Sequence, residues 1–186
     1  MSRVFVITGP SGVGKGTLIR HLLDRLPELE LSVSATTRRP RTGETDGVAY
    51  HFLSDPEFDH RVEAGDFVEY ASYSGRRYGT LRSELERRTS AGVPVVLEIE
   101  VQGARLIAEA MPEAVRIFIA PPSEPALRAR LEGRATDAPE QVEARLTTAR
   151  RELAAQAEFP HVVVNDTLEE AVDALEEIVR TATLGS

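Results

Sequence analysis

The sequence predicts an α/β fold in which a mainly parallel sheet is covered by helices on both faces. Short apolar runs alternate along the chain with longer amphipathic runs, which is the pattern of strand–helix–strand units. The runs at residues 4–7, 93–100 and 115–120 are almost continuously apolar, as expected for strands that are buried on both faces. A hairpin-rich stretch at 35–91 interrupts the alternation and predicts a small inserted subdomain of mixed α/β structure.

Composition limits the classes of function. The chain has 186 residues, enough for one core domain with a small insertion. Its net charge of −8 disfavours a general nucleic-acid binder, because phosphate backbones attract basic surfaces. The absence of cysteine excludes disulfides, thiolate metal sites and a cysteine nucleophile, and it fits a reducing cytoplasm. No apolar run approaches the length of a membrane span, and no signal peptide is visible.

From these features we expect a cytoplasmic protein with small-molecule substrates and no nucleic-acid or membrane partner. We expect a monomer or a homodimer.

The first element is a strand at residues 4–7, and an amphipathic helix follows at 18–26. Between them the chain reads Gly-Pro-Ser-Gly-Val-Gly-Lys-Gly-Thr, and a Gly-x-x-x-x-Gly-Lys motif in this setting is a phosphate-binding loop. Its backbone N–H groups turn toward an anion, and the helix N-terminus adds partial positive charge. Lys15 is the only lysine among 22 basic residues. The predicted nucleoside triphosphate site consists of Gly9, Pro10, Ser11, Gly12, Val13, Gly14, Lys15, Gly16 and Thr17.

The inserted segment follows a second strand expected at 29–34. A polar, turn-rich loop at 35–47 carries Arg38, Arg39 and Arg41, which form either a solvated loop or an anion site. Ser54-Asp-Pro-Glu57 is a capping box that opens a helix to about residue 64. The remaining elements expected here are strands at 48–52, 67–73 and 77–79, with a turn at 74–75, and a helix at 80–91.

The second half of the chain returns to strand–helix alternation. Strands are expected at 93–100, 115–120 and 162–165, and helices at 103–110, 124–132 and 168–181. A second capping box at 137–140 begins a long helix that ends near residue 157. Ligands of such sheets lie beyond the carboxyl ends of the strands, where the phosphate loop, Glu98, Glu100 and Asn165 fall.

The metal site is the part of the motif that departs from the consensus. Gly16 stands where a Ser or Thr hydroxyl usually binds Mg²⁺, and Thr17 follows one place later, which argues against a switch GTPase. Glu98 and Glu100 are therefore candidates for Mg²⁺, directly or through water, together with Thr17. The alternative for the two carboxylates is a solvated strand end.

A lid is suggested by arginines near a glycine. Arg130 and Arg134 are four residues apart and can share a helix face, with Gly133 as a hinge between helix and loop. Mobile positive charge of this kind can close over a transferring phosphoryl group and exclude water.

Over its whole length the chain resembles the guanylate kinase family of P-loop nucleotide kinases. The matching stretches occur in the family's order, and the Ser-x-x-x-Arg-x-Pro-Arg and Tyr-Gly-Thr stretches are more diagnostic than the phosphate loop. Besides that loop they are Ser32-Val-Ser-Ala-Thr-Thr-Arg-Arg-Pro-Arg41 with Gly43-Glu44 and Gly47, Tyr50-x-Phe52, Phe67-Val-Glu-Tyr70, Tyr78-Gly79-Thr80, Leu97-Glu-Ile-Glu-Val-Gln-Gly103, Arg130-Leu-Glu-Gly-Arg134 and Val164-Asn-Asp166.

The resemblance implies reversible transfer of the γ-phosphoryl group of ATP to GMP, with Mg²⁺ as cofactor. It implies a core at about 1–34, 92–124 and 157–186, a GMP-binding insertion at about 35–91, and a helical lid at about 125–156. The implied phosphate ligands of GMP are Ser34, Arg38, Arg41, Tyr50 and Tyr78. The implied catalytic side chains are Lys15, Arg38, Arg130, Arg134 and Arg145, and Arg134 and Asn165 would also contact ATP.

The resemblance further implies that Glu69 and Thr80 read the guanine base. The chemistry agrees, because guanine N1–H and N2–H₂ are adjacent donors for one carboxylate, whereas adenine N1 is an acceptor. The Thr80 hydroxyl would donate to guanine O6. Without the resemblance to this family, the sequence would indicate only that Glu69 is a polar residue on a half-exposed strand.

Two positions depart from the family pattern: Ala135 stands where the lid loop often has Gly, and Glu100 where Asp is usual. Other functions remain open at this point. They are a kinase for another phosphorylated acceptor, such as ribose 1,5-bisphosphate, a non-catalytic guanylate-kinase-like interaction module, and a plain NTPase switch.

Overall fold

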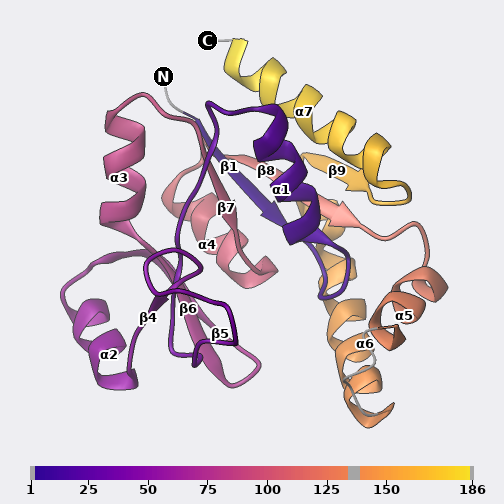
Figure 1. The fold of residues 1–186 in the computed structure, drawn as a ribbon, viewed down its shortest axis with the longest axis horizontal. Coiled ribbons are helices and arrows are strands. Elements are labelled where there is room, and N and C mark those ends of the chain that lie inside the picture. The colour runs from indigo at the N-terminus through magenta and orange to yellow at the C-terminus, as the bar shows by residue number, and fades with distance from the viewer. Residues whose placement is uncertain (1–2, 134–138, 185–186) are drawn as a thin grey trace.

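The computed structural model describes residues 3–133 and 139–184, with backbone alone at 139–141, and contains two sheets (Figure 1). The main sheet is parallel throughout, and Val6 of its central strand pairs with Leu97 on one side and Arg116 on the other. Its strands, in spatial order, are β2 (Glu30–Leu31), β7 (Val95–Glu98), β1 (Val4–Thr8), β8 (Val115–Ala120) and β9 (His161–Val164).

Helices cover both faces of the main sheet. Phe5 and Ile7 of β1 pack with α1 (Lys15–Arg25) and α7 (Leu168–Leu184), while Val4 and Val6 point to the opposite face. That face is covered by α4 (Val101–Ala110), and α3 (Arg82–Ser90) lies beside it. Because both sides of each central strand meet a hydrophobic core, the strands are apolar at every position rather than at alternate ones.

The second sheet lies within the expected insertion and has the order β4-β3-β6-β5. β3 (Ala35–Thr36) and β4 (His51–Phe52) are parallel, whereas β5 (Phe67–Tyr73) and β6 (Arg76–Leu81) form an antiparallel hairpin. Phe58 of α2 (Asp55–Glu63) completes a small core with Ala35, Phe67 and Leu81. Ser54 and Glu57 exchange both bonds of the predicted capping box.

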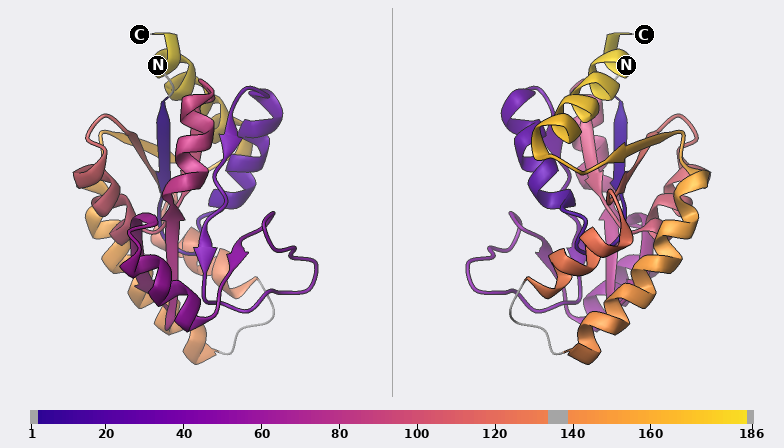
Figure 2. Two further views of the ribbon diagram at one scale, coloured as in Figure 1. Left: turned by 90° about the vertical axis from the view of Figure 1, so that its left-hand side faces the viewer. Right: turned by 90° about the vertical axis from the view of Figure 1, so that its right-hand side faces the viewer.

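Two further helices form a separate pair. α5 (Glu124–Glu132) and α6 (Pro139–Ala154) pack through the apolar side chains Leu127, Leu131, Val142, Leu146 and Ala149. The 3₁₀-helix η1 (Ala155–Glu158) then leads to β9. In Figures 1 and 2 the second sheet and the α5–α6 pair extend from the same end of the main sheet, on opposite sides. No helix within residues 3–133 and 139–184 is long and apolar enough to cross a membrane.

The predicted α/β fold with a parallel core, an inserted mixed subdomain and a helical pair is confirmed. Several details of the prediction were wrong, and among them the strand expected at 48–52 contains only His51–Phe52. Ala35 and Thr36, assigned to a polar loop, are buried in β3, because they pair with β4 and β6 on either side.

The strand expected at 29–34 contains only Glu30–Leu31, because the chain leaves the main sheet there and enters the second one. Thr80 and Leu81, expected in a helix, end β6, and α1 begins at Lys15 rather than at Leu18. The loop expected at 133–137, apart from Gly133, and the side chains of the second capping box lie outside the described residues.

Candidate active site

A cleft of about 1230 Å³ lies where the main sheet, the second sheet and α6 meet. Its described lining carries eight basic and five acidic side chains, although the chain as a whole has a net charge of −8. The positive charges are thus concentrated where a ligand would lie. A cleft that focuses positive potential attracts small anionic ligands.

The predicted phosphate loop joins β1 to α1 at the floor of this cleft. Three of its glycines, Gly9, Gly12 and Gly14, are required by its geometry. Gly9 has a φ of 146°, and a Cβ there would lie 2.3 Å from the carbonyl oxygen of Ile119. Gly14 caps α1 in the left-handed conformation, with a φ of 96°. Lys15 begins α1, is almost buried, and donates from Nζ to the carbonyl oxygens of Gly9 and Pro10.

Asn165 and Arg130 support the phosphate loop from behind. Asn165 donates from Nδ2 to the Val13 carbonyl oxygen over 2.8 Å, and Arg130 donates to the carbonyl oxygen of Asn165 over 2.8 Å. Neither side chain lines the cleft. The structure therefore places both side chains against the phosphate loop.

Helix α6 contacts the front of the loop through Ser11. Arg145 donates to Ser11 Oγ over 3.0 Å, and the Ser11 backbone N–H points to Oε2 of Glu152 over 3.4 Å. Seven residues separate Arg145 from Glu152, so both lie on one face of the helix. Burial, followed by the nearby charge of Glu100, raises the pKa of the Glu152 carboxyl to about 7.

Arg38 lies in a second polar group, on the wall formed by the second sheet. It donates to Glu44 Oε1 over 2.8 Å and lies over the ring of Tyr50, 5.2 Å from its centre. The other oxygen of Glu44 accepts from the backbone N–H of Arg41 over 2.7 Å. The bond from Arg38 is the main cause that lowers the pKa of Glu44. Glu44 thereby connects Arg38 and Arg41, two of the three arginines of the predicted anion site. Ser34 and Tyr78 line the same wall of the cleft.

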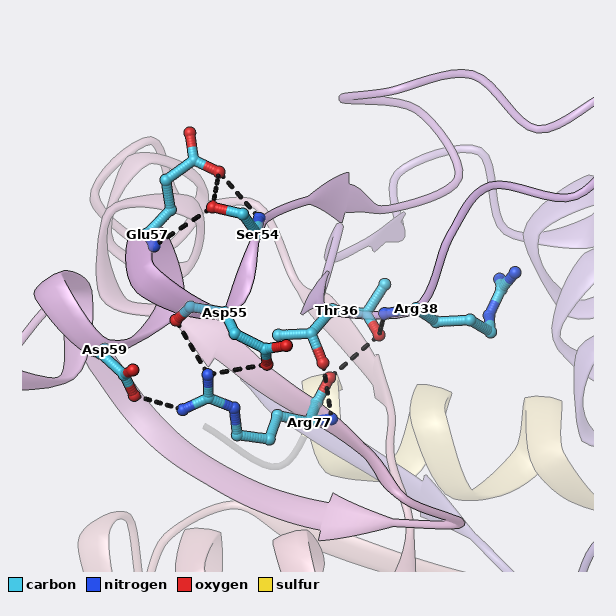
Figure 3. A network of polar contacts seen from close by, with 8 residues as sticks. Thr36, Arg38, Ser54, Asp55, Glu57, Asp59 and Arg77 are labelled. Carbon is cyan, nitrogen blue, oxygen red and sulfur yellow. Dashed lines mark hydrogen bonds and ion pairs between the residues drawn. The ribbon is translucent and has the colours of Figure 1, made fainter.

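A hydrogen-bond network holds the backbone of the chain at Arg38, near the start of the segment that carries Arg38 and Arg41 (Figure 3). Arg77 of β6 donates to the side chains of Asp55 and Asp59 on α2, and its carbonyl oxygen accepts from the Thr36 hydroxyl. That hydroxyl oxygen accepts the backbone N–H of Arg38 over 3.1 Å. Figure 3 shows the Arg38 side chain extending away from the network, so its backbone is fixed while its guanidinium faces the cleft.

Glu69 on β5 is buried at the edge of the cleft, with 5% of its surface exposed. The Thr80 hydroxyl donates to its Oε1 over 2.8 Å. Thr80 is fully buried and is not part of the lining, so in this structure its hydroxyl is directed at Glu69. Burial raises the pKa of Glu69, and the bond from Thr80 opposes the shift.

Glu98 and Glu100 lie at the end of β7 and both line the cleft together with Thr17. Glu98 is exposed to the cleft yet surrounded by its walls, and the resulting loss of hydration raises its pKa, while Lys15 opposes the shift. Oε2 of Glu100 is buried and has no hydrogen-bond partner. Within the described residues, no three His, Asp or Glu side chains converge as a complete metal cage. One or two carboxylates and a hydroxyl nevertheless fit Mg²⁺, which usually takes its other ligands from water and phosphate.

The cleft thus brings together most of the side chains predicted from the sequence. It does not include Gly9, Val13, Thr80, Arg130 or Asn165, and Arg134 and Ala135 lie outside the described residues. Sequence reasoning gave no role to Glu44 or Glu152. The seven-residue spacing from Arg145 to Glu152 is a sequence feature from which a shared helix face could have been inferred.

Comparisons with known proteins agree with this geometry. The family model described as "Guanylate kinase" matches residues 1–182. The chain is 50% identical to a guanylate kinase of Synechococcus sp. (strain CC9311), covering 95% of this chain and 93% of the relative. It is 52% identical to a guanylate kinase of Frankia casuarinae, covering 91% and 92%. The crystal structure of guanylate kinase from Anaplasma phagocytophilum matches with a TM-score of 0.79 at 34% identity, over 97% of this chain and 85% of that one. This chain belongs to the guanylate kinase family.

Proposed function

We propose that this protein is a guanylate kinase that transfers the γ-phosphoryl group of ATP to the phosphate of GMP. The observation that carries the proposal is a single cleft with a phosphate loop on its floor, arginines on its second-sheet wall and a buried carboxylate, Glu69, at its edge. The first feature suits a triphosphate donor, and the other two suit a purine monophosphate acceptor.

In the proposed reaction, an oxygen of the GMP phosphate attacks the γ-phosphorus of ATP, and the bond to the bridging oxygen of ADP breaks. The attacking oxygen is already anionic, so the protein needs no general base. Catalysis then depends on in-line positioning and on neutralising the charge of the phosphates.

Most of the predicted side chains have a direct role in this scheme, and the Thr80 hydroxyl, which now donates to Glu69, would turn to donate to guanine O6. Lys15 would leave the loop carbonyls and contact the transferred phosphate, and Arg145 would contact it from α6. Arg38, Arg41, Ser34, Tyr50 and Tyr78 would hold the acceptor phosphate, and Glu69 would accept N1–H and N2–H₂ of guanine. Arg130 would clamp the phosphates and Asn165 would contact ATP, both from their places against the phosphate loop, and Arg134, outside the described residues, would be the second lid arginine.

Mg²⁺ is the proposed cofactor, and Glu98, Glu100 and Thr17 would hold it, directly or through water. Bound there, the ion would neutralise charge on the triphosphate. The segments about 35–91 and 125–156 are the proposed acceptor domain and lid, and their closure would exclude water from the phosphates.

A coupled assay of ADP formation with GMP, AMP and sugar phosphates as acceptors tests the proposal. GMP should be the preferred acceptor by a large factor in kcat/KM, and GDP should appear in equal amount with ADP. Preference for a sugar phosphate, or ATP binding without GDP formation, would reject it.

A further inference from the structure

Gly103 lies in the first turn of α4, directly beside the carboxylate of Glu69. A Cβ placed on Gly103 would lie 2.8 Å from Glu69 Oε2 and 3.3 Å from its Cδ, whereas ordinary contact begins at 3.4 Å. The third of the three nearest atoms, Ile99 Cδ1, is at 3.5 Å, an ordinary contact. The two contacts that are too short for an alanine are therefore both made by one functional group, the Glu69 carboxylate.

The backbone at this position does not require glycine. Gly103 is helical and does not have a positive φ, in contrast to Gly9, Gly12 and Gly14 of the phosphate loop. Glycine within a helix is less stable than alanine, because it loses more backbone freedom on folding. Because the backbone gives no reason for glycine here, the reason lies in the neighbouring side chain, which needs the space that a Cβ would fill.

The neighbour has little freedom to move. Glu69 is buried on β5, which packs against α4, and Oε1 already accepts from the Thr80 hydroxyl. Oε2, on the Gly103 side, is the oxygen left for a ligand in the cleft. A methyl group on α4 would push this oxygen by roughly 0.6 Å, away from the helix and out of its present alignment with Thr80.

We propose that Gly103 is a positioning residue for acceptor specificity: its missing side chain provides the space in which the Glu69 carboxylate faces the purine. This inference rests on the proposed function, because it assigns Glu69 to the base of the acceptor. It adds a residue that contacts no substrate and acts only through the carboxylate beside it.

The test is the Gly103→Ala variant, measured in steady state with GMP and ATP varied separately and by thermal denaturation. KM for GMP should rise about 10- to 100-fold, the loss typical of a catalytic or binding group displaced by a fraction of an ångström to 1 Å. KM for ATP should stay within about twofold. The melting temperature should stay equal or rise, because alanine favours the helix. The matched control is Glu109→Ala, an exposed change on the same helix, which should leave all three quantities unchanged.

A double-mutant cycle with Glu69→Asp isolates the contact. Aspartate is one methylene shorter and withdraws the carboxylate from residue 103, so Gly103→Ala should cost much less in the Glu69→Asp background than in the wild type. An equal cost in both backgrounds, an unchanged KM for GMP, or a large fall in melting temperature would each overturn the proposed role of Gly103. Failure of the wild type itself to phosphorylate GMP would instead reject the proposed function.

Discussion

Glu69→Gln should separate substrate recognition from protein stability. The substitution keeps the size of the side chain but removes its charge and one of its two acceptors. Glu69 is 5% exposed and already accepts from Thr80, so the amide has two orientations. Either its NH₂ faces the guanine donors, or its NH₂ faces Thr80 and a single neutral oxygen faces guanine. In both cases at least one charge-assisted hydrogen bond to guanine is lost, and such a bond contributes about 1.5–3 kcal/mol.

We therefore expect a loss of about 3 kcal/mol in transition-state binding, or roughly 100-fold in kcat/KM for GMP. The effect on stability has the opposite sign. Burial raises the pKa of Glu69, so the folded protein favours the neutral carboxyl. The free energy of unfolding therefore falls as pH rises from the ordinary pKa of a glutamate to the raised pKa in the folded protein. The neutral amide does not have this cost. At pH 8 the melting temperature of Glu69→Gln should therefore be higher than that of the wild type.

The assay is steady-state kinetics with GMP varied at saturating ATP, paired with calorimetry at pH 5 and pH 8. Glu109→Gln, the same substitution at an exposed site on α4, is the matched control. A loss of less than about fivefold in kcat/KM for GMP would refute the reasoning. So would an equal loss in ATP affinity, because Glu69 would then act on the fold and not on the base.

Four further outcomes are expected. Lys15→Ala should lower kcat by orders of magnitude at an unchanged melting temperature, and near-normal turnover would contradict the role of Lys15. KM for GMP should rise as pH falls through the raised pKa of Glu69, because only the carboxylate accepts two donors, while Glu69→Gln should show a flat profile in the same pH series. Chelation by EDTA should abolish turnover and Mg²⁺ should restore it, with the far-ultraviolet spectrum unchanged; activity in EDTA would exclude the metal. Arg77→Gln removes the bonds to Asp55 and Asp59 near Arg38, so it should lower the free energy of unfolding in urea by about 1–2 kcal/mol. It should also raise KM for GMP more than KM for ATP, and equal changes in the two KM values would argue against this.

The sequence correctly predicted those helices and strands that are determined by residues within or next to the element itself. The strands Phe67–Tyr73 and Val115–Ala120 and the helix Glu124–Glu132 begin and end where their patterns predicted. Gly9, Gly12 and Gly14 helped to identify the phosphate loop because their positive φ angles are ones that other residues rarely adopt.

What the sequence could not predict depends on contacts between distant segments. Two-residue β3 exists because β4 and β6 flank it, and a polar stretch of sequence gives no indication of that. Ser11 and Glu152 meet across 141 residues of chain. Glu44 and Arg38 are only six residues apart, yet an acidic residue among arginines reads equally as a solvated loop. The requirement for Gly103 becomes visible only once β5 is placed against α4.

The small core beneath the second sheet has a thermodynamic consequence. Ala35, Phe58, Phe67 and Leu81 bury little apolar surface and form a cluster separate from the two that flank the main sheet. Regions with so few buried contacts open locally at a lower free energy than the whole molecule unfolds. Amide hydrogens of β5 and β6 should therefore exchange with deuterium sooner than those of β1 and β8. An acceptor that binds only the folded insertion would slow that exchange as its concentration rises above Kd, so the substrate stabilises the domain that recognises it against local opening.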